Sequence, residues 1–168
     1  DVPFALEGGT AVGTGRGDEL SPALATGGFH WVLALSDSGL STPVVYRTLD
    51  QHREDYIVDL GPQPDLVKVD TAVLQAVRVG DAGSLADAMH NDLQVAALRL
   101  APELTALLEL GESRGALSGI VSGSGPTVAF LVGSSQEAAE LLGVLTRAGH
   151  RALTVTGPVA GARVLDAH

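Results

Sequence analysis

The chain has 168 residues, 45% of them apolar, a composition that indicates a folded core and excludes an intrinsically disordered chain. Its 10 basic and 20 acidic residues give a formal net charge of −10, which argues against a nucleic-acid surface because binding to phosphates needs clustered Lys and Arg. The absence of cysteine excludes a disulfide framework and a cysteine nucleophile, and no apolar run approaches the roughly 20 residues that cross a bilayer.

The first 28 residues are rich in glycine. A short strand is predicted over 10–12, followed by a turn at the glycine run 13–17. This run could suggest a phosphate loop, but Asp18 and Glu19 follow where the Walker pattern has Gly-Lys-Ser/Thr. We therefore favour a tight turn at the edge of a sheet.

The next elements are a strand and a helix. Bulky apolar residues over 29–35, bounded by Gly28 and a polar stretch, predict a buried strand. A helix is predicted to begin near Thr42, a good N-cap, with Pro43 at the first helical position, where its missing N–H costs nothing. A charged, proline-containing stretch then predicts a mobile loop over 55–65.

Residues 66–114 have helical periodicity throughout, and Pro102 is expected to open the last helix of this region. In the last third the period changes. Strands are predicted over 117–121, 127–132, 152–156 and 162–165, with a helix that begins at Ser134 or Ser135 and ends at Gly149. From residue 29 onward the order is strand, helices, strand, strand, helix, strand. This order indicates an α+β fold of the ferredoxin-like, split βαβ type, with extra helices in its first crossover.

One glycine motif lies in the turn between two predicted strands, at Ser122-Gly123-Ser124-Gly125-Pro126. Successive amides in such a turn can form a nest that faces an anion. An ordinary hairpin with two positive-φ glycines is the alternative, and the spacing alone favours it. A dinucleotide-binding fingerprint is excluded because the glycine spacing differs and a strand follows rather than a helix.

Other candidate residues each have a structural alternative. Asp1 could act as a base or orient a hydroxyl, or it could be a solvated chain end. Tyr46 could be a core aromatic or a stacking platform for a nucleobase. The pair Asn91-Asp92, predicted to lie within a helix, could contact a ligand, form part of an exposed face or make a helix–helix hydrogen bond. The five histidines lack the spacing of metal ligands, so no metal site is predicted.

Taken together, these pieces resemble the 4-diphosphocytidyl-2-C-methyl-D-erythritol kinases, a family within the GHMP kinase superfamily, over the whole chain and in family order. The motifs that carry the resemblance are Asp1-Val2-Pro3-Phe4, Gly8-Gly9-Thr10-Ala11, Gly13-Thr14-Gly15-Arg16-Gly17, Ser41-Thr42-Pro43-Val44-Val45-Tyr46, Asn91-Asp92 and Ser122-Gly123-Ser124-Gly125-Pro126-Thr127. The glycine motif is common to the superfamily, whereas the Asp-Val-Pro start combined with Ser-Thr-Pro-Val-Val-Tyr is much narrower.

The resemblance implies a role for each matched position. Asp1 is the implied catalytic carboxylate, Tyr46 the aromatic that stacks on cytosine, and Thr42 a neighbour in the substrate site. Ser122, Gly123, Ser124 and Gly125 form the implied loop on the phosphate side. Residues 1–28 would be the tail of an N-terminal domain, and residues 29–168 the GHMP kinase C-terminal domain.

The implied reaction is an ATP- and Mg²⁺-dependent phosphorylation of the 2-hydroxyl of the methylerythritol substrate. The family's early lysine and main ATP loop are not among these 168 residues, so we expect this C-terminal portion to be inactive alone. The expected enzyme is cytoplasmic, a monomer or weak dimer, and binds neither nucleic acid nor membrane. A non-catalytic binding module and another small-molecule GHMP kinase remain the alternatives.

Overall fold

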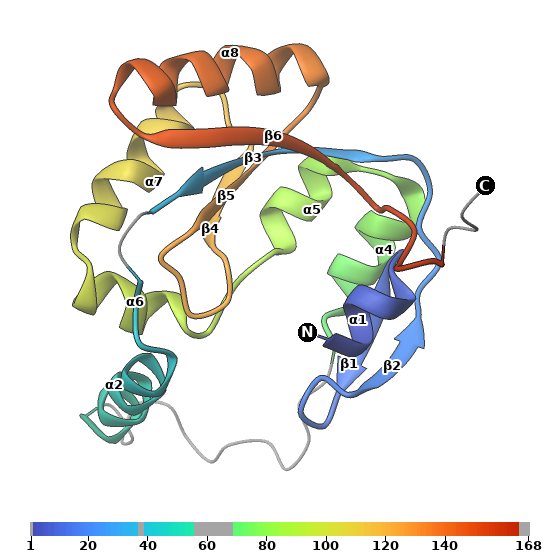
Figure 1. Ribbon diagram of the computed structural model, residues 1–168, viewed down its shortest axis with the longest axis horizontal. Coiled ribbons are helices and arrows are strands. Elements are labelled where there is room, and N and C mark those ends of the chain that lie inside the picture. Colours follow the sequence, from blue (N-terminus) through green and yellow to red (C-terminus); the bar gives the residue numbers. More distant parts are fainter. Residues whose placement is uncertain (1, 37–38, 56–68, 165–168) are drawn as a thin grey trace.

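The computed structural model describes residues 2–36, 39–55 and 69–164 (Figure 1). Its main sheet has four antiparallel strands in the order β4–β5–β3–β6. The strands are β3 (Phe29–Leu35), β4 (Ser118–Val121), β5 (Val128–Val132) and β6 (Arg151–Gly157). The first and third of them, β3 and β5, lie side by side in the middle, which is the predicted ferredoxin-like arrangement. The α+β fold class is thereby confirmed.

Helices fill both crossovers of this sheet. The first crossover, from β3 to β4, contains α2 (Thr42–Asp55), α4 (Thr71–Val79), α5 (Ala82–Ala88), α6 (Gln94–Leu100) and α7 (Glu103–Ser113). The second crossover contains α8 (Ser135–Arg147). Among the described residues, no helix combines the length and the apolar character that a membrane span requires.

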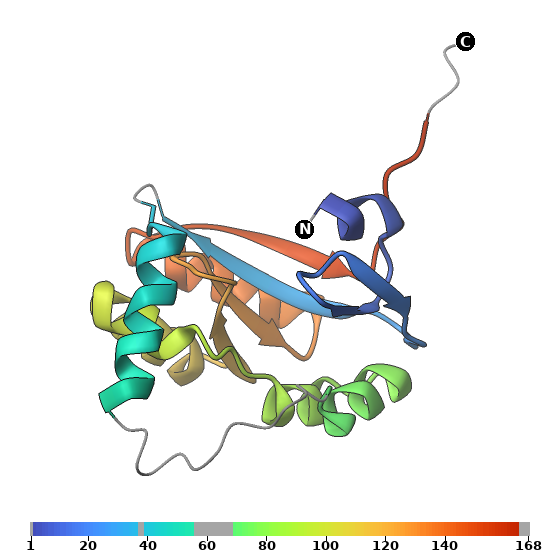
Figure 2. The same ribbon diagram turned by 90° about the horizontal axis from the view of Figure 1, so that it is seen from below.

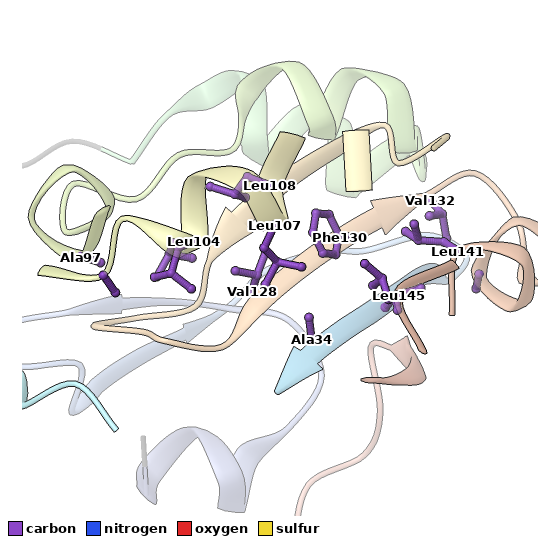
Figure 3. Packing of buried hydrophobic residues seen from close by; sticks show 14 residues of the cluster. Ala34, Ala97, Leu104, Leu107, Leu108, Val128, Phe130, Val132, Leu141 and Leu145 are labelled. Atoms are coloured by element: carbon purple, nitrogen blue, oxygen red, sulfur yellow. The ribbon is translucent and has the colours of Figure 1, made fainter. Parts of the chain in front are cut away.

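The main core lies between one face of the sheet and the helices α7 and α8 (Figure 3). Strand alternation directs Val32, Val128 and Phe130 to this face, where Leu107 and Leu141 of the two helices meet them. Phe130 is fully buried against Gly111 and Gly119, neither of which has room for a Cβ. These contacts pack α7 and α8 against one face of the sheet. The other face packs against different helices.

On the opposite face of the sheet, Phe29 and Leu131 pack against Ala76 and Val77 of α4 and Leu85 of α5. Figure 2 shows these two helices in green beneath the sheet, with α2 standing apart from them at the left. A third, smaller core joins Val45 and Leu49 of α2 to Ala96 of α6. This small core attaches α2 to the helix that follows the α5–α6 turn.

The N-terminal residues contain a second, two-stranded sheet. Helix α1 (Val2–Glu7) precedes a two-stranded hairpin of β1 (Ala11–Thr14) and β2 (Glu19–Pro22), which turns where Gly17 N–H donates to Thr14 O at 2.9 Å. The edge turn predicted at the glycine run is confirmed. The hairpin geometry also agrees with the rejection of a Walker loop there.

Two predictions about helices and strands are wrong. The helical region is interrupted between α5 and α6, because Met89 adopts an extended backbone and Asn91 forms a local turn instead. The strand predicted over 162–165 is absent from its described residues, since Ala162 N–H donates to Ala5 O of α1. The loop predicted over 55–65 lies outside the described residues, except for Asp55, which ends α2.

Candidate functional site

The glycine motif forms the turn between β4 and β5. Ser122 N–H donates to Thr127 O at 2.8 Å, and Gly125 N–H donates to Ser122 O at 2.9 Å. Gly123 and Gly125 have φ values of 57° and 79°, a backbone region that residues other than glycine rarely adopt. The hairpin alternative therefore describes the backbone correctly, and it leaves open whether the turn also binds an anion.

The N-terminus of α2 meets this turn. Thr42 Oγ1 lies 2.8 Å from Ser124 Oγ, a hydrogen bond between residues 82 positions apart. Ser41 O accepts from the N–H groups of Val44 and Val45, so the helix begins near Thr42 as predicted. The N-cap is Ser41 and not Thr42, which is the first helical residue and bonds to Ser124 instead. Figure 1 shows α2 below and to the left of the β4–β5 turn. Two of the predicted site elements, far apart in the sequence, are thus neighbours.

Tyr46 is exposed, with 53% of its surface accessible, which rules out the core alternative for this aromatic. It lies four residues after Thr42 in α2, and residues at this spacing share one face of a helix. The buried Val45 and Leu49 hold the other side of the helix against Ala96. An aromatic ring and a hydroxyl group therefore occupy the same side of α2.

Asn91 and Asp92 lie in the turn between α5 and α6, not within a helix as predicted. The Asn91 amide Nδ2 donates to Val121 O at 2.8 Å and to Gly123 O at 2.7 Å. Asp92 Oδ2 lies 3.4 Å from Arg53 Nη2 of α2. Sequence reasoning missed these contacts, because nothing local in the sequence indicates partners that lie 30 or more positions away.

Asp1, the predicted catalytic carboxylate, lies outside the described residues. Of the other predicted site residues, the structure brings together Thr42, Ser124 and the rest of the glycine turn, with Tyr46 one helical turn further along α2. Figure 1 shows α1 toward the right-hand end of the sheet and α2 toward its left-hand end.

No group of three or more His, Asp or Glu side chains suited to a metal ion occurs within residues 2–36, 39–55 and 69–164. A cavity of about 250 Å³ reaches Pro126 at the far end of the glycine turn. It is lined on its other sides by residues of β3, α7 and β6, among them Glu103 and Arg151. Thr42 and Tyr46 do not line it, so this cavity is separate from the face of α2 described above.

Comparison with known proteins agrees with the fold. Residues 73–151 match the family model described as GHMP kinases C terminal. A homoserine kinase from Cytophaga hutchinsonii superimposes with a TM-score of 0.68 over 95% of this chain and 51% of its own, but at 14% identity this likeness shows the fold alone. The chain therefore has the fold of the GHMP kinase C-terminal domain.

Relatives with high similarity to this chain are named 4-diphosphocytidyl-2-C-methyl-D-erythritol kinase. Those of Leifsonia xyli and Clavibacter michiganensis are each 58% identical, over 99% and 98% of this chain and 54% and 53% of their own lengths. A crystal structure of 4-(cytidine 5'-diphospho)-2C-methyl-D-erythritol kinase matches at 28% identity and a TM-score of 0.65, over 87% of this chain and 48% of its own. The resemblance predicted from the motifs is confirmed, and the chain spans about half the length of these relatives.

Proposed function

We propose that this chain is part of a small-molecule kinase that transfers phosphate from ATP to the 2-hydroxyl of 4-diphosphocytidyl-2-C-methyl-D-erythritol, a step of non-mevalonate isoprenoid synthesis. The observation that carries the proposal is the 58% identity over 99% of the chain to a relative named for this activity. The hydrogen bond between Thr42 and Ser124 supports it, because two motifs of the family resemblance are in direct contact.

The face of α2 provides the proposed site for the cytidine. The Tyr46 side chain is exposed, and cytosine could stack on its ring, an interaction that contributes about 1–3 kcal/mol per base. Thr42 presents a hydroxyl group on the same side of the helix and can hydrogen-bond the substrate. An aromatic platform with a nearby polar group suits a nucleoside better than it suits a short hydroxy acid.

The glycine turn is the proposed phosphate side of the site. Its glycines adopt positive φ, and backbone amides in such a turn can converge on an anion. The contact between this turn and α2 would set the distance between the part of the site that binds cytosine and the part that binds the diphosphate. Ser122, Gly123, Ser124 and Gly125 would thus orient the substrate through its phosphates, while Tyr46 holds its base.

Asp1 is the proposed catalytic carboxylate, on the family resemblance alone. Its role would be to accept the proton of the attacking hydroxyl or to hold that hydroxyl in line with the phosphate of ATP. When bound, Mg²⁺ would neutralise charge on the transferred phosphate. The described residues offer no cluster of ligands for that ion, so we derive no step through it.

We further propose that residues 1–28 form the tail of an N-terminal domain and residues 29–168 the C-terminal domain. In support, α1 has no buried residue, and Val2 and Leu6 of this helix are 73% and 63% exposed. Apolar side chains this exposed are typical of a surface that another part of a protein covers. The separate two-stranded sheet of β1 and β2 is consistent with the same boundary.

The whole enzyme is proposed to act in the cytoplasm, where ATP is supplied, as a monomer or weak dimer. The net charge of −10 favours small-molecule partners over nucleic acid. Residues 1–168 alone are expected to be inactive, because the family's main ATP loop is not among them.

The test is a phosphoryl-transfer assay on the full-length gene product with ATP and three acceptors: 4-diphosphocytidyl-2-C-methyl-D-erythritol, mevalonate and homoserine. We expect turnover of the cytidyl acceptor alone, with ³¹P and ¹³C NMR locating the new phosphate on the 2-hydroxyl. Turnover of mevalonate or homoserine instead would assign the chain to another GHMP kinase. Binding of cytidine nucleotides without any transfer would favour a non-catalytic module.

A further inference from the structure

Asn91, the only asparagine of the chain, occupies the turn between α5 and α6. We propose that Asn91 is a positioning residue that sets the orientation of the glycine turn and, through it, of the Ser124 amide. The effect of Asn91 on the orientation of the turn is inferred from its hydrogen bonds alone. The effect of that orientation on phosphate binding rests on the proposed function.

The Asn91 side chain makes three of the four hydrogen bonds open to an amide. Its Nδ2 donates one hydrogen to Val121 O at 2.8 Å and the other to Gly123 O at 2.7 Å. Its Oδ1 accepts from Leu93 N–H at 2.9 Å. Two acceptors face the nitrogen and one donor faces the oxygen, so this orientation of the amide is the one that satisfies all three partners. Aspartate has the same shape but cannot donate to two carbonyls.

The two carbonyl groups that Asn91 holds belong to peptide planes of the turn. A trans peptide is planar, so its N–H points away from its C=O. Fixing Val121 O therefore directs the N–H of Ser122, which donates to Thr127 O at 2.8 Å. Fixing Gly123 O directs the N–H of Ser124 away from Asn91. One side chain thus sets the directions of the Ser122 and Ser124 N–H groups, one on each side of Gly123, whose positive φ makes the bend possible.

Two residues close to Asn91 in the sequence, Asp92 and Gln94, also bind α2 and β4. Gln94, at the start of α6, accepts from Val121 N–H at 2.8 Å through its Oε1, so both backbone groups of Val121 bond to the α5–α6 region. Asp92 pairs with Arg53 of α2 at 3.4 Å. This pair is largely solvated, and exposed pairs of this kind are weak. The α5–α6 turn therefore contacts both halves of the proposed site, with Asn91 as its main polar link to the glycine turn.

Two variants of the full-length gene product separate positioning from a general loss of stability. Asn91→Asp keeps the shape and the acceptor for Leu93 N–H, but its carboxylate faces two carbonyl oxygens. Asn91→Ser can keep the local turn, because a serine hydroxyl also accepts from the backbone two residues on, but it lacks the paired donors. Gln75→Glu, on the exposed side of α4, makes the same change of amide to carboxylate away from the turn.

The first readout is amide hydrogen exchange without substrate. In both Asn91 variants we expect the protection factors of Ser122 and Gly125 to fall at least tenfold, while those of Val32 and Phe130 in the sheet and all those in Gln75→Glu stay within threefold. Asn91→Asp should regain part of this protection between pH 7 and pH 5, because a protonated carboxyl group can donate one hydrogen bond; Asn91→Ser should not. Unchanged protection of Ser122 and Gly125 in either folded variant would overturn the proposal.

The second readout is steady-state kinetics with ATP and the cytidyl acceptor. We expect Asn91→Asp at pH 8 to lower kcat at least tenfold. The KM for the acceptor should change less than threefold, because the cytosine of the acceptor binds at Tyr46, which the substitution leaves intact. Recovery of kcat toward the wild-type value at lower pH should parallel the recovery of amide protection. A matched loss of kcat in both variants without any such recovery would assign Asn91 a structural role alone. If the wild-type protein does not turn over the cytidyl acceptor, the proposed function fails, and hydrogen exchange still decides the role of Asn91.

Discussion

The side-chain hydroxyl groups of Thr42 and Ser124 lie 2.8 Å apart, although 82 residues separate them in the sequence. Thr42 begins α2, and Ser124 stands at the centre of the β4–β5 turn. This hydrogen bond joins the helix that presents Tyr46 to the turn that presents glycine amides. The geometry of the proposed site therefore depends on how firmly these two elements are held together.

A double-mutant cycle measures this link. Thr42→Val and Ser124→Ala each remove one partner, so the second substitution should cost less once the first has been made. We expect a coupling of about 0.5–1.5 kcal/mol in the free energy of unfolding, the usual net value of one hydrogen bond. Thr48→Val in the same helix is the matched control, and its combination with Ser124→Ala should be additive. A coupling of zero for Thr42 and Ser124 would mean that the contact does not persist in solution.

Tyr46 should govern affinity for the cytidyl group. Tyr46→Ala removes the ring from the exposed face of α2 and is expected to weaken binding of the cytidyl acceptor by about 1–3 kcal/mol, seen as an increase in KM. Tyr46→Phe keeps the ring and should stay close to wild type. Because the side chain is exposed, neither change should alter stability much. An unchanged KM for Tyr46→Ala would remove Tyr46 from the site.

The two glycines of the turn should respond differently to alanine. At Gly125, φ is 79° and an added Cβ would lie 2.9 Å from Val121 Cγ1, so Gly125→Ala combines backbone strain with overpacking. We expect it to cost about 2–4 kcal/mol of unfolding free energy. At Gly123 the space is open, and Gly123→Ala should cost only about 1–2 kcal/mol for its positive φ. Equal losses in thermal or denaturant unfolding would contradict this account of the turn.

Asp81, the N-cap residue of α5, should make the free energy of unfolding depend on pH in the acidic range. The Ser84 hydroxyl and the N–H groups of Ser84 and Gly83 donate to the Asp81 carboxylate, and these bonds hold its pKa below the ordinary value of 3.8. A depressed pKa contributes stability that is complete above the unfolded pKa and is lost as pH falls through the folded one. Ser84→Ala, which removes the largest cause, should raise the Asp81 pKa in a ¹³C titration and reduce the acid-dependent loss of stability. An unshifted titration would mean that the Ser84 hydroxyl does not hold the carboxylate.

Local signals in the sequence predicted much of the fold. The strand over 29–35 coincides with β3, because an apolar run between polar and glycine-rich stretches is a local pattern. The start of α2 at Thr42 and the cap of α8 by Ser134 were equally local, since a side-chain or backbone oxygen near the helix start accepts the first N–H groups.

The features that could not be predicted from the sequence depend on contacts between residues far apart in the chain. The break at Asn91 went unnoticed because apolar periodicity continues across it, while the bonds that stabilise the turn go to residues 30 and 32 positions away. Helix α1 has no buried residue, so no apolar face indicated it. The motifs predicted which residues of α2 and the glycine turn matter, but only the three-dimensional packing brings Thr42 to Ser124.

We propose that α2 and the glycine turn form one site for a cytidyl diphosphate. Titration of the isotope-labelled full-length gene product with cytidine diphosphate, followed by ¹H–¹⁵N and ¹H–¹³C NMR, measures binding at both elements in one experiment. We expect the signals of Thr42, the Tyr46 ring, Gly123 and Ser124 to shift together with a single Kd, and mevalonate to leave them unshifted. Shifts confined to other parts of the molecule, or a Kd that is unchanged in Tyr46→Ala, would contradict it.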